Sequence, residues 1–272
     1  METYRLKNII ILILLLLNVF LLILAGSRYY AQQCAERALI TETTSFLSNH
    51  DTGIDPAFLR GSTSGVSYSC SRAPDEELSF AEALLGNITR QDNAGGGTHR
   101  YTSASGIATF RASGAVSVEY SAPALTLSSA KEFVRRYCPA NYKLSGTTLS
   151  KDEDRLTLTA IPYLEGLPIY SAAIQFVFEN NVLVSASGYF VPSSAVQTDS
   201  AEAITKCSAV IYLIDDCNEQ GRICNTITEV STGYILQSTA SVPLLLTPVY
   251  RICTNTYNYY VNALTGHVTL IR

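Results

Sequence analysis

Side chains that could perform catalysis are present in this sequence, but their spacing does not form a catalytic motif. His50, His99 and His267 are far apart, and none has the partner four residues on that defines an H-E-x-x-H zinc helix. The sequence contains no G-x-S-x-G nucleophile elbow. The acidic cluster at 215–219 lacks the ligand loop of a calcium-binding EF-hand. We therefore predict no catalytic residue, no metal site, no cofactor and no enzymatic activity.

Cysteine is the other reactive side chain, and the chain has seven, none in C-x-x-C spacing. An odd number leaves at least one thiol outside any intramolecular disulfide. A disulfide framework would suit an oxidising compartment, whereas buried thiols would serve as small apolar side chains. We favour buried thiols for most of them. One disulfide among Cys207, Cys217, Cys224 and Cys253 stays open as an alternative.

Residues 9–25, IIILILLLLNVFLLILA, form an almost unbroken apolar run near a basic start. As a helix the run is roughly 25 Å long, close to the thickness of a hydrocarbon core. A cleaved signal peptide would also contain such a run, but its apolar region is usually shorter. We predict an uncleaved membrane anchor within residues 1–26. Arg5 and Lys7 favour a cytoplasmic N-terminus, with the remainder outside the cell membrane.

The charge of the remainder limits its partners. The whole chain carries a formal charge of −4, and Glu2, Arg5 and Lys7 give residues 1–26 a charge of +1, so the rest carries −5. A mildly acidic exterior argues against binding to nucleic acid.

The pattern after the anchor predicts an α+β fold. Residues 27–53 lack proline and continue as a stalk helix that glycine at 53 would end. Capping boxes at Ser79, Ser129 and Asp199 predict three further helices. Each helix precedes sequence with strand-like alternation and turn residues, which indicates repeated units of a helix with an antiparallel sheet. The expected units are residues 54–122, 123–195 and 196–272.

Asn18 is the one polar side chain inside the apolar run. An asparagine in lipid can form a hydrogen bond with another helix, although a single one can also simply be tolerated. We predict that Asn18, together with Phe20, contacts a partner transmembrane helix.

Two strand motifs carry a resemblance to a known family. They are YLEGLPIY at 163–170, and PVYRI at 248–252 followed by YYVNALTG at 259–266. With the basic start and the Leu-rich anchor, they resemble the YycI/YycH family of membrane-anchored regulators of the WalK (YycG) sensor histidine kinase. Related endings also occur in PepSY-type domains. The motif residues are Gly166, Pro168, Tyr170, Pro248, Tyr250, Arg251, Tyr260, Asn262 and Gly266.

The resemblance implies a regulatory protein of the bacterial cell envelope. Its partner would be a membrane sensor histidine kinase, together with a YycH-like co-regulator, and the two-component system would be controlled by protein–protein contact. A PepSY-like inhibitor or chaperone of an extracellular hydrolase is the alternative. A cell-envelope enzyme ranks last, because no nucleophile or metal set is present.

The anchor interpretation makes a direct prediction about the mature protein. Because the apolar run is longer than a signal peptide requires, the protein extracted from membranes should keep residues 6–27. Intact-mass spectrometry measures this. A mature N-terminus at Ser27 or Arg28 would show that the run is a signal peptide instead.

Overall fold

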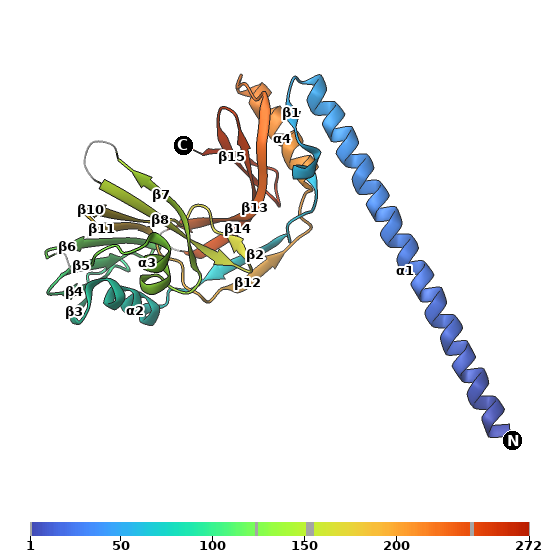
Figure 1. The fold of residues 1–272 in the computed structure, drawn as a ribbon, viewed down its shortest axis with the longest axis horizontal. Coiled ribbons are helices and arrows are strands. Elements are labelled where there is room, and N and C mark those ends of the chain that lie inside the picture. The colour runs from blue at the N-terminus through green and yellow to red at the C-terminus, as the bar shows by residue number, and fades with distance from the viewer. Residues whose placement is uncertain (1, 123–124, 151–154, 240–241, 272) are drawn as a thin grey trace.

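The computed structural model describes residues 2–122, 125–150, 155–239 and 242–271. The predicted α+β class is confirmed, because one long apolar helix precedes two mainly antiparallel sheets with helices on them (Figure 1). Helix α1 extends away from the folded domain as a free rod (Figure 1). Its apolar part is long and hydrophobic enough to cross a membrane, and none of it is buried in the protein.

Helix α1 covers Glu2–Asn49 without a break, so anchor and stalk are one helix of 48 residues. Glycine at 53 does not end it. Asp51 takes the left-handed conformation, with φ 55°, and Thr52 donates its N–H to the Leu47 carbonyl at 2.9 Å. Aspartate tolerates this region better than most residues. Gly53 is therefore free to start strand β1, Gly53–Ile54, which pairs in parallel with β13.

The end of α1 is fixed to the domain by one face. Ile40, Thr43 and Leu47 are buried there, at the spacing of a single helix face. They pack with the 3-10 helix η1, Pro56–Leu59, and with helix α4, Lys206–Glu219. The Glu36 carboxylate also accepts the Gly61 N–H at 3.2 Å.

The larger sheet has nine strands in the order β3-β4-β5-β6-β11-β10-β8-β7, with β9 paired to β8. Helices α2, Pro74–Leu85, and α3, Ala130–Tyr137, cover one of its faces and share an aromatic core with it. The strands are β3 Ile88–Asn93, β4 His99–Ser103, β5 Gly106–Phe110, β6 Ala115–Tyr120, β7 Tyr142–Leu149, β8 Arg155–Leu164, β9 Leu167–Pro168, β10 Ile174–Glu179 and β11 Val182–Tyr189.

The smaller sheet has seven strands and contains the C-terminus. Helix α4 and the end of α1 cover one face, and their core includes Tyr250, Ile252 and Tyr259. Strand β14 pairs with β13 on one side, and with both β2 and β15 on the other. Besides β1, the strands are β2 Val66–Cys70, β12 Val196–Ser200, β13 Thr226–Thr239, β14 Val242–Thr254, β15 Asn258–Asn262 and β16 Val268–Ile271.

The element order repeats a helix followed by an antiparallel meander three times, beginning at α2, α3 and α4. In space the grouping differs from the expected units. Strand β6 pairs with β11, so the boundary after residue 122 divides a single sheet. Residues 123–124 themselves lie outside the described part. Strand β2 belongs to the C-terminal sheet although it lies within 54–122.

Only one of the three predicted helix caps is confirmed. The Ser129 side chain accepts the N–H of Glu132 at the start of α3. The prediction for Ser79 is wrong, because Pro74 starts α2 earlier and acidic residues fill its first turn. The prediction for Asp199 is also wrong, since this residue lies in β12, and Thr205 caps α4 by accepting the Ser208 N–H.

The cysteines differ sharply in exposure, which predicts their reactivity. Cys34 on α1 is exposed, and the other six are half-buried or buried. Burial raises the pKa of Cys70 and Cys224 to about 11 and of Cys138 to about 12. It raises the pKa of Cys207, Cys217 and Cys253 as well.

Because the thiolate is the reactive form, one thiol should react rapidly with maleimide at neutral pH. Thiol titration before and after denaturation measures this, and Cys34→Ser should remove the rapid phase. Several rapid thiols in the native Cys34→Ser protein would contradict this burial pattern.

Candidate functional site

A tight hairpin between β8 and β9 positions the first motif. Glu165 and Gly166 form its turn, with φ 50° and 80°, as the preferred two-residue hairpin turns require. Tyr163 then lies opposite Pro168, and Leu164 opposite Leu167. Gly166 therefore acts through its backbone, by reversing the chain.

After this hairpin the chain crosses from the larger sheet to the smaller one. Ile169 forms a parallel bridge with Tyr234 of β13, and Tyr170 donates its N–H to the Tyr234 carbonyl at 2.9 Å. Leu164, Leu167 and Ile169 face a third core that also includes Tyr234. Because neighbouring residues of an extended chain face opposite ways, Tyr163, Pro168 and Tyr170 share the face that points away from this third core.

The Tyr170 ring lies against the smaller sheet on the face that α4 does not cover. It stacks on Tyr260 of β15, with centroids 5.9 Å apart and an interplanar angle of 25°. Its hydroxyl donates to the Thr232 carbonyl at 3.1 Å. The ring passes so close to Gly233 that an added Cβ would lie 2.5 Å from it. The absence of a side chain at position 233 thus allows the two sheets to meet.

Arg251 completes this group. It pairs in register with Tyr260 of β15, so the two side chains share a face. Its guanidinium carbon lies 5.5 Å from the centre of the Tyr170 ring, a cation–π distance. Burial raises the pKa of Tyr170 and Tyr260, and the positive charge of Arg251 partly opposes this. Both tyrosines are therefore neutral hydrogen-bonding groups at physiological pH.

A second cation–π pair lies on the larger sheet. The Lys143 ammonium of β7 is 4.3 Å from the centre of the Tyr163 ring. Tyr163 and Tyr170 flank the same hairpin, and Pro168 lies opposite Tyr163 two residues before Tyr170. We call Lys143, Tyr163, Tyr170, Arg251 and Tyr260 the junction strip. Pro168, Tyr170, Arg251 and Tyr260 were predicted as site residues, and the structure brings them together.

The other motif residues have structural positions. Tyr250 is fully buried on the opposite face, where its hydroxyl donates to the Ile204 carbonyl at 2.7 Å and accepts the Thr63 N–H at 3.3 Å. Pro248 accepts the Ala263 N–H through its carbonyl at 2.9 Å.

Asn262 and Gly266 shape the turn after β15. The Asn262 side-chain oxygen accepts the N–H groups of Leu264 and Thr265 at 2.8 and 3.0 Å. Gly266 has φ 74° and leaves room for the Tyr212 ring of α4. Asn262 therefore fixes the turn, and Gly266 lets the turn pack against the Tyr212 ring of α4.

Asn18 and Phe20 lie apart from this strip on the free part of α1. Phe20 is exposed, and the Asn18 side-chain N–H group donates to the Leu14 carbonyl of its own helix at 3.0 Å. Asn18 keeps a second N–H and its carbonyl oxygen for other contacts. Their contact with a partner helix stays a prediction.

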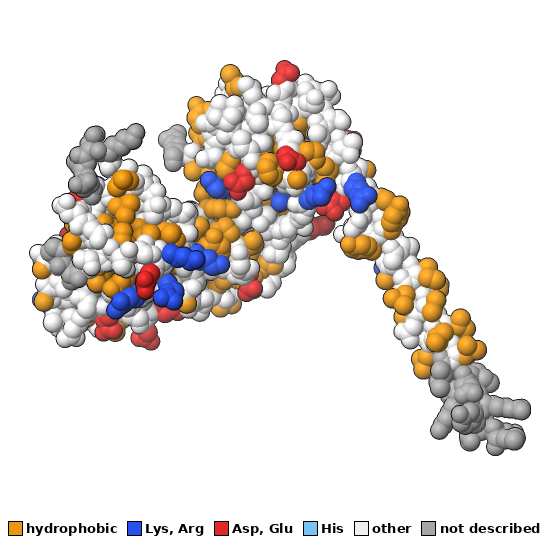
Figure 2. Space-filling model, viewed as in Figure 1, with side chains coloured by type: hydrophobic (Ala, Val, Ile, Leu, Met, Phe, Trp, Pro, Cys, Tyr) orange, Lys and Arg blue, Asp and Glu red, His pale blue; other side chains and the backbone are white. Residues whose placement is uncertain are grey.

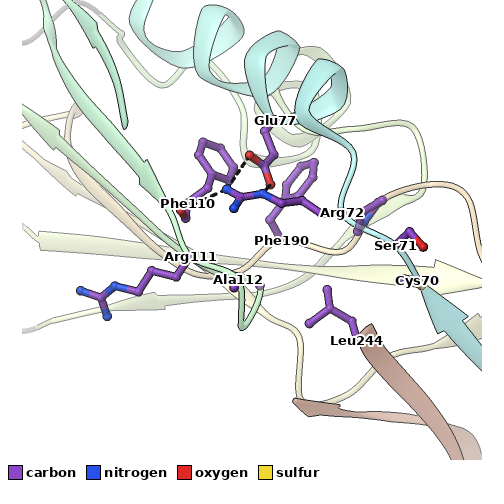
Figure 3. A pocket seen from close by; sticks show the side chains of 11 residues that line it. Cys70, Ser71, Arg72, Glu77, Phe110, Arg111, Ala112, Phe190 and Leu244 are labelled. Carbon is purple, nitrogen blue, oxygen red and sulfur yellow. Dashed lines mark hydrogen bonds and ion pairs between the residues drawn. The ribbon is translucent and has the colours of Figure 1, made fainter. Parts of the chain in front are cut away.

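A small cavity of about 210 Å³ lies between the two sheets and α2 (Figure 3). Its polar wall is an ion pair: Arg72 Nε and Nη2 donate to the two Glu77 carboxylate oxygens at 2.7 and 2.9 Å. Nη2 also donates to the Phe110 carbonyl, and Nη1 donates to the Gly97 carbonyl. Each guanidinium nitrogen therefore has an acceptor. The ion pair serves to neutralise the buried Glu77 and to join α2 to the sheets.

Two features of the site were missed in the sequence. Lys143 lies outside both motifs, and only the β7–β8 pairing places it beside Tyr163. The Arg72–Glu77 pair has a five-residue spacing that predicts no contact by itself. Among the described residues, no group of three or more His, Cys, Asp and Glu side chains could hold a metal ion.

Comparison with known proteins gives only distant likenesses. No protein-family model and no curated protein matches the chain. An uncharacterized protein from Eubacterium rectale ATCC 33656 has 12% identity and a TM-score of 0.49, covering 81% of this chain and 90% of that one. The C-terminal domain of Bacillus megaterium YpeB has 10% identity and a TM-score of 0.41, covering 75% and 99%. Likeness this weak identifies neither the fold nor the function.

The contact at Gly233 generates a stability prediction with a matched control. In Gly233→Ala the new Cβ would lie 2.5 Å from both the Pro168 carbonyl oxygen and the Tyr170 ring. Relieving that clash should cost about 1–3 kcal/mol of unfolding free energy, measurable by urea denaturation. Gly146→Ala on β7 meets nothing within 4 Å and should change stability by less than about 0.5 kcal/mol. Equal effects of the two substitutions would contradict the close approach of the sheets.

Proposed function

We propose that this protein is a membrane-anchored regulator of the YycI/YycH type. It acts by protein–protein contact on a sensor histidine kinase in the same membrane. Its N-terminus is cytoplasmic and its two-sheet domain extracytoplasmic. The motif resemblance and the basic residues before the apolar run support this arrangement.

One observation carries the proposal: the unbroken helix between the apolar run and the domain. At about 1.5 Å per residue, a helix of 48 residues is roughly 72 Å long. Residues 28–32 are exposed all round, and the domain first contacts α1 near Glu36 and Ile40. Residues 28–49 contain neither proline nor glycine, and α1 continues through Gly26 and Ser27 without a break. The helix can therefore pass a rotation or a displacement from the domain to its membrane faces, and back.

This continuity fixes where the membrane face containing Asn18 points relative to the domain. A partner that binds both parts is then held in one orientation. Such a partner can shift a two-state kinase only if it binds the two states with different affinity. A rigid regulator does this well, because it complements one kinase geometry and not the other.

A helix-phase experiment tests the proposal. Each helical residue turns the chain by about 100°, so two alanines inserted between Ala31 and Gln32 rotate the domain by roughly 200°. Seven inserted residues return it to within about 20°. With the full-length protein and a WalK-type kinase of the same organism, the two-residue insertion should reduce co-purification and regulation of autophosphorylation at least fivefold. The seven-residue insertion should restore most of both.

The controls separate rigid coupling from simple tethering. Both insertion variants should reach the membrane in equal amounts, because the apolar run is unchanged. If both insertions regulate as the unmodified protein does, α1 is only a tether. If the kinase never co-purifies with the unmodified protein, the regulatory proposal itself is wrong.

A further inference from the structure

We propose that the junction strip binds an extended acidic segment of a partner protein, with Arg251 and Lys143 each donating hydrogen bonds to a carboxylate. This inference deepens the proposed function and rests on its premise of protein–protein contact. It specifies which surface of this protein binds the partner and that the partner's segment is acidic.

The two cations lack acidic partners of their own. Among the described residues, Arg251 and Lys143 form no side-chain hydrogen bond and no ion pair, and each lies near the centre of a tyrosine ring. By contrast, Arg72 and Arg222 are paired with carboxylates at 2.7 and 2.6 Å. A guanidinium stacked by its face on a ring keeps its edge N–H groups available. These groups match a carboxylate in a planar, two-bond geometry.

The surrounding charges favour an acidic partner at this place. The chain beyond residue 26 carries −5 overall, whereas the junction strip itself contains two cations and no acidic side chain. Burial and, to a smaller extent, the negative charge of Glu229 raise the pKa of Tyr170, and Glu165 lies in the turn of the β8–β9 hairpin. Both glutamates are exposed, and neither forms an ion pair with the strip. Each glutamate would repel a carboxylate of the segment that is not aligned with Arg251 or Lys143, which would help to fix where the segment binds.

The shape of the strip suits an extended segment. Tyr163, Pro168 and Tyr170 are half-buried and face away from the third core, and Tyr260 continues the row onto the smaller sheet. Alternate residues of an extended peptide lie about 7 Å apart on one face, so its side chains can meet successive members of such a row. Tyrosine and arginine are also the residues that most often dominate binding energy at protein interfaces.

The strip lies where a partner can reach it. The molecule is hollowed between its two sheets (Figure 2). Strands β7 and β8 border this hollow on one side and β14 and β15 on the other, and these strands carry most of the strip (Figure 1). Helices α2, α3 and α4 cover the opposite faces of the sheets. No described helix therefore covers the strip.

A direct binding measurement tests the proposal without any kinase. The full-length protein in detergent micelles is titrated against a fluorescein-labelled peptide of about ten residues with alternating Glu and Thr, and anisotropy is recorded. A peptide of alternating Gln and Thr is the control ligand. We expect the Glu peptide to bind at least about tenfold more tightly, and less tightly as NaCl is raised.

Matched variants locate the binding. Arg251→Gln should weaken binding of the Glu peptide about tenfold, and Lys143→Gln several-fold. Arg136→Gln is the matched control, because Arg136 stacks on Tyr137 at the same 5.5 Å but lies on α3. It should bind as the unmodified protein does. Reversing both charges, with Lys143→Glu and Arg251→Glu, should transfer preference to a peptide of alternating Lys and Thr.

Thermal unfolding of each variant checks that it is folded, and Arg251→Lys provides a milder change that should give an intermediate affinity. The proposal is overturned if neither peptide binds saturably, if both bind equally, or if Arg136→Gln loses as much as Arg251→Gln. Such a result would not change the outcome of the helix-phase experiment. A wrong assignment of the binding surface can therefore be distinguished from a wrong regulatory function.

Discussion

The architecture depends on one close approach of two backbones, where the chain after β9 passes over Gly233 of β13. At this point the Pro168 carbonyl and the Tyr170 ring occupy the space that a side chain at 233 would need. The Ile169–Tyr234 bridge closes the contact, and Ile169, Tyr234 and Leu246 bury it in a small core. The two sheets are further joined by the chain between β2 and α2 and by the chain between β11 and β12. The same approach creates the junction strip, because it brings a hairpin of one sheet against Arg251 and Tyr260 of the other.

Features encoded within a few residues could be predicted from the sequence. The apolar run and the cap at Ser129 follow from local chemistry, and the structure has both. The β10–β11 turn at Asn180 and Asn181 is likewise encoded by two neighbouring residues. Both asparagines adopt φ above zero, as a two-residue hairpin turn demands. Local signals failed where another local signal was stronger. Helix α2 begins at Pro74, so Ser79 lies inside the helix and cannot cap it. After α1, the left-handed conformation is adopted by Asp51 and not by Gly53.

Features that depend on distant pairing could not be predicted in this way. Nothing near β6 or β11 indicates that they pair, yet this pairing merges two helix-plus-meander units into one sheet. The pairing of β2 with β14 likewise joins segments that are far apart in the chain. The candidate site shows the same division. The motifs supplied Tyr170, Arg251 and Tyr260, but only the fold shows that they touch and that Lys143 extends the row.

Strand β13 connects the two features on which the functional proposals rest. Its first residues, Thr226 and Ile227, pair with β1 directly after the end of α1. Its middle residue Gly233 lies under the Tyr170 ring of the strip. Seven residues of extended chain separate these points, roughly 23 Å of strand held by hydrogen bonds to β14. A paired strand resists bending more than a loop does, because bending it breaks ladder hydrogen bonds. Strand β13 is therefore the direct, hydrogen-bonded link between the strip and the strand that follows α1.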